Sequence, residues 1–199
     1  DGIHADSATT ISGGTIDITE SYEGIEGLSI DITGGETYVS GPTNDGNSAL
    51  DYNGTGIVTG GIFIAAGLSG MAENFGDSST QGVMMVTVNS QAAGSAVSLS
   101  DSSGNELVSW TPEKEYTSVI ISCPEITTGQ EYTLTTGSDT TQITMDSIVY
   151  GSGSGMGGNP GNGGGPGNGG DMGQKPDDGN GTGKGPGDGG NMGTPPEKS

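Results

Sequence analysis

The sequence predicts an all-β protein that begins with a parallel β-helix, continues into antiparallel capping strands and ends in a disordered Gly/Pro-rich tail. Three observations predict this class: a repeat of 22 to 24 residues, short segments in which apolar and polar residues alternate, and Gly pairs between those segments. Alternation with a period of two is typical of strands, and Gly pairs are typical of tight turns. Helical repeats of this length require an apolar period near 3.6, which is absent.

The repeat is visible as four dipeptides that align at spacings of 22, 24 and 22 residues: Gly2-Ile3, Gly24-Ile25, Ser48-Ala49 and Gly70-Met71. One repeat is long enough for one coil of a parallel β-helix, and coils stack because one coil cannot bury its own apolar face. We therefore expect one inward-facing row formed by Ile3, Ile25, Ala49 and Met71.

A second recurring element is a Gly pair followed by a short alternating strand. The Gly pairs are Gly13-Gly14, Gly34-Gly35 and Gly60-Gly61, and the strands that follow cover 15–18, 36–39 and 62–65. In stacked coils these strands predict a second inward row formed by Ile16, Val39 and Phe63.

The pattern changes near Gln81, where the remaining strands follow one another closely enough to be antiparallel. The expected strands are 83–88, 96–99, 107–110, 118–121, 132–134 and 143–145. The segment 101–105 (Asp-Ser-Ser-Gly-Asn) has the composition of a hairpin turn. Such strands would cap the end of the solenoid and cover an edge that could otherwise aggregate. The single cysteine, Cys123, lies in an apolar run, which predicts a buried structural role.

Composition divides the chain into three parts: β-helix coils at 1–78, an antiparallel cap or small sandwich at 79–150, and a tail at 151–199. Half of the 42 glycines and six of the nine prolines lie in the tail, which has no apolar periodicity. Such a segment cannot bury enough surface to offset its chain entropy and is typical of a flexible spacer. Because the chain starts inside a repeat, we expect that further coils precede Asp1.

The charge distribution restricts the partners of the chain. It contains 25 acidic residues, four lysines and no arginine, and the first lysine is Lys114. Such a surface repels phosphate backbones and anionic lipids, which argues against nucleic-acid binding and against binding to a membrane surface. No segment is apolar for long enough to span a bilayer, so no membrane insertion is expected.

Stacking of the coils would bring oxygen donors together at one corner of the solenoid. Neighbouring strands lie about 4.8 Å apart, so Asp1 would stack on Glu23 and His4 on Glu26. Asn47 and Leu50 would extend these two columns into the next coil, with Asp45 and Asp51 beside them.

Carboxylates at this spacing raise one another's pKa unless a cation intervenes, and oxygen-rich donors favour Ca²⁺ over zinc. The alternative is that these acids only face solvent.

Several segments resemble a family of bacterial, secreted carbohydrate-binding β-helix proteins. They are DGIHAD, TISGGTIDIT, SYEGIEG, ITGG, GPTNDGNSALDYNG and GLSGMAE, and the likeness covers Asp1 to about Val149. The resemblance implies a right-handed, pectate-lyase-like β-helix with bound calcium that binds cellulose and pectin (polygalacturonate). It places the acids of DGIHAD and YEGIEG at the calcium sites. Mainly from the stacking of the coils, the candidate metal ligands are Asp1, His4, Asp6, Glu23, Glu26, Asp45, Asn47 and Asp51.

These observations favour a noncatalytic, extracellular or cell-surface bacterial protein that binds plant cell-wall polysaccharide through Ca²⁺. Tyr22 and Tyr52 flank the acidic columns and are the candidate stacking faces for sugar rings, although ordinary strand packing explains them equally well. One alternative is an adhesin-like solenoid that calcium only stiffens. Another is a pectin hydrolase or lyase; residues 1–113 hold no Lys or Arg to act as the base of a lyase, but acids for hydrolysis are plentiful.

Overall fold

The structure is a computed structural model that describes residues 1–151, and in this range the protein is all-β. Ten strands make up the described part: β1 (Ile3–Ile18), β2 (Ile25–Ser40), β3 (Leu50–Gly67), β4 (Val83–Gln91), β5 (Val97–Asp101), β6 (Glu106–Trp110), β7 (Tyr116–Ser122), β8 (Glu131–Thr136), β9 (Asp139–Thr144) and β10 (Val149–Tyr150). The predicted all-β class is therefore confirmed. The predicted tail lies, from residue 152 onward, outside the described residues.

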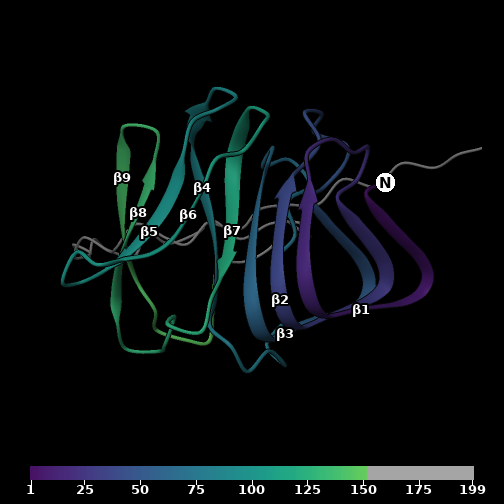
Figure 1. The fold of residues 1–199 in the computed structure, drawn as a ribbon, viewed down its shortest axis with the longest axis horizontal. Helices are drawn as coiled ribbons and strands as arrows, with labels where there is room; N and C mark the ends of the chain where they lie inside the picture. The colour runs from purple at the N-terminus through teal and green to yellow at the C-terminus, as the bar shows by residue number, and fades with distance from the viewer. Residues whose placement is uncertain (152–199) are drawn as a thin grey trace, which may run out of the picture. The chain divides into compact units, whose positions relative to one another are not determined.

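The three repeats form the long, curved strands β1, β2 and β3, which pair in parallel and stack side by side (Figure 1). Each strand curves through its Gly pair, whose second glycine has a positive φ of 83°, 83° and 86° at Gly14, Gly35 and Gly61. Only glycine adopts this conformation without steric cost. The Gly pairs thus mark the same turn in all three repeats, as the sequence predicts.

The apolar rows between the stacked strands differ in part from the expected ones. Ile3 pairs with Ile25, but the third member is Leu50 rather than Ala49, and Met71 is half exposed at 51% instead of lying in the row. Leu50 is fully buried, so the larger side chain takes the place in the row. The repeat therefore lengthens from 22 residues to 25 between these two pairs.

The second expected row was also wrong, by two residues on β2. Ile16 pairs with Thr37 and then Phe63, while Val39 pairs with Ile18. Because strand side chains alternate, a shift of two residues keeps Val39 on the buried face and changes only its partner. Phe63 packs instead against the edge of Phe75, with ring centroids 5.0 Å apart.

The repeat strands continue directly into the second half of the chain. The first sheet runs β1-β2-β3-β7-β4-β10; β7 pairs antiparallel with both β3 and β4, and β10 pairs parallel with β4. The sheet is therefore mixed. The predicted boundary between 78 and 79 lies in the connection from β3 to β4, and hydrogen bonds of β3 to β7 join the two parts.

A second, antiparallel sheet of order β6-β5-β8-β9 packs on the first one. Side chains of β3 divide between two cores: Phe63 and Ala65 join the core of the repeats, and Ile64 joins a core shared with Leu99 and Leu134 of the second sheet. The turn at 101–105 connects β5 to β6 as predicted. Cys123 is buried, as expected, and burial raises its pKa to about 12.

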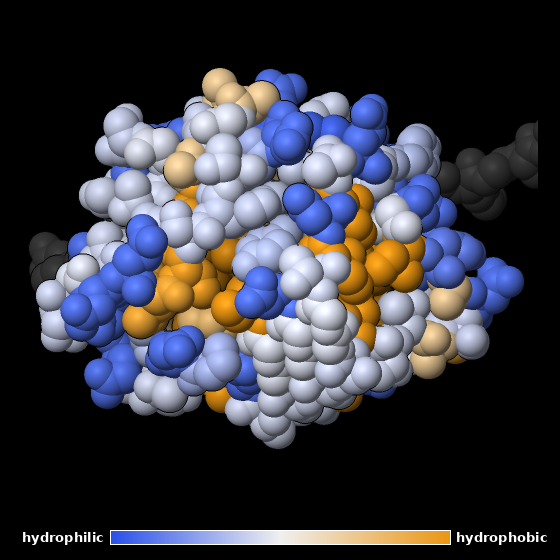
Figure 2. Space-filling view, viewed as in Figure 1, coloured by the Kyte–Doolittle hydropathy of each residue, from blue (hydrophilic) through white to orange (hydrophobic). Residues whose placement is uncertain are grey.

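The surface in Figure 2 shows hydrophobic atoms mainly in recesses between hydrophilic side chains, as the edges of two packed cores would produce. Within residues 1–151, no helix is long and apolar enough to cross a lipid bilayer.

Candidate functional site

The candidate site lies where the repeat strands β1, β2 and β3 begin. The register of these strands places His4 beside Glu26 and Glu26 beside Asp51. Leu50 was predicted as the third member of this column and Asn47 as a member of the neighbouring column, and this prediction was wrong. The longer second repeat moves each of these residues by one position, and Leu50 is used in the core instead.

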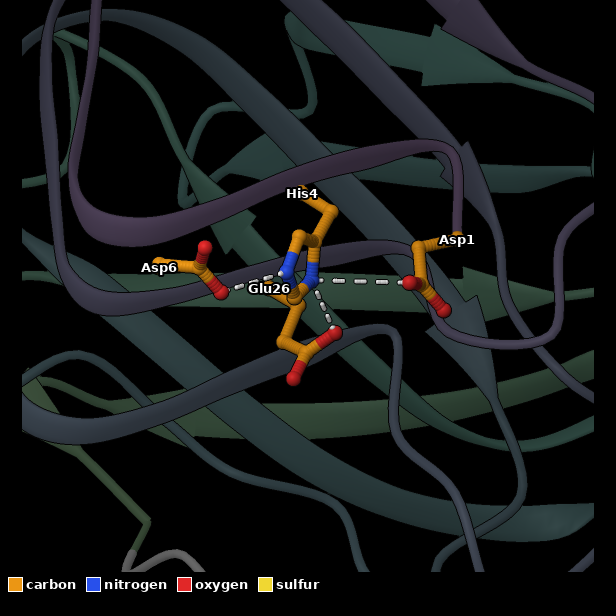
Figure 3. A network of polar contacts seen from close by, with 4 residues as sticks. All are labelled: Asp1, His4, Asp6 and Glu26. Carbon is orange, nitrogen blue, oxygen red and sulfur yellow. Dashed lines mark hydrogen bonds and ion pairs between the residues drawn. The ribbon is translucent and has the colours of Figure 1, made fainter.

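His4 is the centre of a small polar network, shown in Figure 3. Its Nδ1 atom lies 2.6 Å from a carboxylate oxygen of Glu26 and 3.5 Å from one of Asp1. Its Nε2 atom lies 3.3 Å from a carboxylate oxygen of Asp6. The His4 ring thus contacts three carboxylates, one of which comes from the neighbouring strand.

The same network supplies a set of possible metal donors. One atom each from Asp1, His4 and Glu26 lies within 4.8 Å of the other two. The two carboxylates fit Ca²⁺, which prefers oxygen ligands, whereas an imidazole nitrogen is a better ligand for transition metals. A Ca²⁺ ion held here would therefore use Asp1 and Glu26 and take further oxygens from elsewhere.

The electrostatics of the site reflect an excess of negative charge. Hydrogen bonds to Glu26 and then Asp6 raise the pKa of His4 above its ordinary value, because both carboxylates stabilise the imidazolium. Partial burial raises the pKa of Glu23, and the neighbouring charges of Glu26 and Asp51 raise it further. The carboxylates of successive strands are therefore close enough to repel one another.

The acids Asp1, Glu23, Glu26 and Asp51 lie near the starts of β1, β2 and β3 and form an acidic row. Glu73 extends this acidic row and was not among the predicted ligands. It is half buried, and its carboxylate accepts a 3.0 Å hydrogen bond from the backbone N–H of Tyr52. Burial raises the pKa of Glu73, the Tyr52 hydrogen bond lowers it, and the charge of Asp51 raises it further. The sequence signal for Glu73 is its position two residues after Met71 in the fourth repeat. The alignment of Gly70-Met71 with the earlier dipeptides placed Glu73 out of register with the other acids.

Four other predicted ligands are outside the group of donors within 4.8 Å: Asp6, Glu23, Asp45 and Asp51. Asn47 is buried, and its side-chain amide donates a 3.0 Å hydrogen bond to the carbonyl oxygen of Tyr22. Asp45 is exposed and packs against Gly70, where an added Cβ atom would lie 2.8 Å from that of Asp45. These contacts support the loop between β2 and β3.

The two predicted sugar-stacking tyrosines occupy different environments. Tyr22 is 69% exposed and directly precedes Glu23, so its ring is free to contact a ligand beside the acidic row. Tyr52 is partly buried, its hydroxyl donates a 2.6 Å hydrogen bond to the carbonyl oxygen of Asn74, and burial raises its pKa to about 12. Of the two, Tyr22 is better placed for stacking on a sugar.

Comparison of the chain with models of protein families, with curated proteins and with solved structures found no match.

Proposed function

We propose that this protein is a noncatalytic polysaccharide-binding protein that uses Ca²⁺ to bind an acidic cell-wall polysaccharide such as polygalacturonate. The observation that carries the proposal is the row of acids that starts β1, β2 and β3, in which Asp1 and Glu26 meet around His4. The resemblance of DGIHAD and SYEGIEG to calcium-containing β-helix proteins of bacteria points to the same function.

We also propose that the repeat strands are coils of a right-handed parallel β-helix, which presents the acids. Their parallel pairing and the repeated turn at each Gly pair support this architecture. Regular stacking places equivalent side chains of successive coils side by side. A row of ligands along the stack matches the repeating carboxylates of an extended polyuronate.

Charge explains why the ion is needed. The chain carries a formal net charge of −21, so it repels a polyanion unless a cation lies between the two. Ca²⁺ takes six to eight oxygen ligands, more than Asp1 and Glu26 provide, so carboxylates of the polysaccharide would complete its coordination. Tyr22 would add an apolar face for a sugar ring at the end of the row. The protein would then act outside the bacterial cell or on its surface, on plant cell-wall polysaccharide.

The same acids support one alternative, an adhesin-like solenoid that calcium stiffens. Glu26 of β2 contacts His4 of β1, so an ion at this position would tie two neighbouring strands together whether or not a polysaccharide is present. The two functions differ in what the ion changes: binding of a polymer in one case, and only the free energy of unfolding in the other.

Titration calorimetry of the full chain with polygalacturonate, in Ca²⁺ and again in chelator, tests the proposal. We expect binding in Ca²⁺, none in chelator, and a circular dichroism spectrum that is unchanged between the two. D1N/E26Q should weaken binding by about tenfold or more, since one lost charged contact costs about 1.5–3 kcal/mol. D31N/D77N removes the same charge from exposed or partly exposed positions outside the site and should bind as the original chain does.

Other outcomes would separate the alternatives. Thermal stabilisation by Ca²⁺ without polygalacturonate binding would favour the stiffened solenoid. Calcium-independent binding to cellulose would show a binder that does not use the acidic row. Release of reducing ends or unsaturated uronates from the polymer would show an enzyme and contradict the proposal.

A further inference from the structure

A second candidate site is an open groove on another part of the repeats. Its volume is about 430 Å³, and the three Gly pairs contribute Gly14, Gly35 and Gly61 to its lining. Thr15, Glu36 and Ile62, which follow these glycines and pair with one another across β1, β2 and β3, form the adjoining surface. The groove is thus a direct product of the repeat.

The opposite side of the groove comes from the second half of the chain. It consists of Leu107 on β6 together with Pro124 and Glu125, which follow β7. Leu107 has no partner on β5, because Val108 pairs with Leu99 and Glu106 pairs with Ser100. This bulge turns the Leu107 side chain toward the groove, as bulges commonly re-aim a side chain at the edge of a sheet.

Strand β6 borders the groove with an open edge. Among the described residues β6 pairs with β5 alone, so one row of its backbone N–H and C=O groups has no strand partner. An open edge of this kind is a template for an added strand, and several peptide-binding domains use it in this way.

The charged groups around the groove are all of one sign. Glu36 and Glu125 line it, and no described residue in its lining is basic. The charges of Glu36 and Asp17 raise the pKa of Tyr38 beside them, after the larger effect of burial. The only Lys or Arg in residues 1–151 is Lys114, so the protein itself supplies little positive charge for these carboxylates.

An aromatic pair stands next to Glu36. The Tyr38 hydroxyl donates a 3.3 Å hydrogen bond to the Glu36 carboxylate, and its ring stacks on Trp110 of β6 with centroids 5.9 Å apart. Both rings are partly exposed. Aromatic faces beside carboxylates attract ammonium and guanidinium groups, because the cation interacts with the ring and with the negative charge together.

We propose that this groove binds an extended peptide segment rich in Lys or Arg from a partner protein, which adds as a strand to the open edge of β6. Backbone hydrogen bonds to β6 hold the segment, and its cationic side chains pair with Glu36 and Glu125 and lie against Tyr38 or Trp110. The site is separate from the acidic row that starts β1, β2 and β3, and the inference does not depend on polysaccharide binding.

The test uses the fluorescence of Trp110, the single tryptophan of the chain, during titration of the full chain with short capped peptides. The probe is a hexapeptide of alternating Thr and Lys, and the first control is the same peptide with Glu in place of Lys. A third peptide keeps the lysines but carries N-methyl groups on all of its backbone amides, which prevents strand addition from either edge. We expect saturable binding of the lysine peptide, none of the glutamate peptide, and binding of the methylated peptide weakened at least about tenfold.

Variants separate the groove from general attraction to a chain of net charge −21. E36Q/E125Q should weaken binding of the lysine peptide by about fivefold or more, since each exposed ion pair contributes up to about 1 kcal/mol. D31N/D77N removes the same charge outside the groove and should change the affinity by less than about twofold. D1N/E26Q should also leave peptide binding unchanged, which distinguishes this site from the proposed calcium site.

Three results would overturn the proposal. Equal weakening by E36Q/E125Q and D31N/D77N would show diffuse attraction rather than a site. Equal affinity for the methylated peptide would exclude strand addition to β6. Saturable quenching of Trp110 by a neutral oligosaccharide, with no response to the lysine peptide, would show that the groove takes a sugar instead.

Discussion

At the scale of single residues, His4 has the contacts that define the acidic site. It stands between carboxylates of its own strand and of the next, and these contacts raise its pKa. A proton on the imidazole is one way to offset the negative charge, and a divalent cation at Asp1 and Glu26 is another. The two should compete, since the same Glu26 carboxylate serves both.

This competition can be measured from the titration of His4, the single histidine, by NMR. We expect a pKa above 6.5 in the original chain and a lower one in E26Q, because Glu26 contributes most to the shift. Since the folded-state pKa is raised, the stabilising contribution of the imidazolium is present below the unfolded pKa and is lost as pH rises through the folded one.

Added Ca²⁺ should lower the pKa of His4 if the ion binds at Asp1 and Glu26. D6N removes the charge of Asp6, whose hydrogen bond raises the pKa of His4 less than that of Glu26, so it should lower the pKa less than E26Q does. An unchanged pKa in E26Q would contradict the geometry of Figure 3.

At the scale of elements, the Gly pairs decide how closely β1, β2 and β3 stack. Gly14 and Gly35 have the same φ of 83°, but they differ in their surroundings. A Cβ atom on Gly35 would lie 2.7 Å from backbone atoms of Gly13 and Gly14, whereas one on Gly14 would have no neighbour within 4 Å. The stack therefore excludes a side chain at Gly35 and tolerates one at Gly14.

The two glycines form a matched pair for measuring this effect. Gly14→Ala should cost about 1–2 kcal/mol, the conformational cost of a positive φ in a residue with a Cβ. Gly35→Ala should cost clearly more, because the neighbouring strand must also move away. Urea unfolding of both variants measures the difference, and equal losses would show that the strands do not approach as closely as the structure indicates.

At the scale of the whole molecule, strand β7 connects the repeats to the second half of the chain. It lies between β3 and β4 in the first sheet, and its side chains reach both cores: Ile120 packs in the core of the repeats and Ile121 in the core between the sheets. The described residues also fall within one compact unit of the chain. Neither core is complete without β7.

We therefore expect residues 1–151 to unfold in one cooperative transition. Leu50→Ala in the core of the repeats and Leu134→Ala in the other core should each cost about 2–5 kcal/mol and lower the same transition. Leu28→Ala, at a position 56% exposed, is the control and should have little effect. Thermal unfolding followed by circular dichroism and by Trp110 fluorescence gives the result, and two separate transitions would contradict it.

The amino-acid sequence by itself determined the all-β class, the repeat, the turn at each Gly pair and the strands after Gln81. These features are local: alternation and paired glycines act within a few residues, so they can be recognised without knowing what packs against them. The place of His4 beside Glu26 followed from the first spacing of 22 residues, which the structure retains between Ile3 and Ile25. The contacts of Asp1 and Asp6 with the His4 ring did not follow from that spacing.

Only the tertiary structure decided the register of the third repeat and the joining of the two halves. Whether Ala49 or Leu50 stacks on Ile25 depends on how the whole loop from Gly41 to Asn47 packs, and that choice moves Asp51 into the His4 column and Asn47 out of the site. The pairing of β3 with β7 depends on contacts between residues far apart in the chain. Strand pairing is nonlocal. The alternation of apolar and polar residues therefore predicts which face of the sheet a residue occupies, but it does not predict which residue of the neighbouring strand lies beside it.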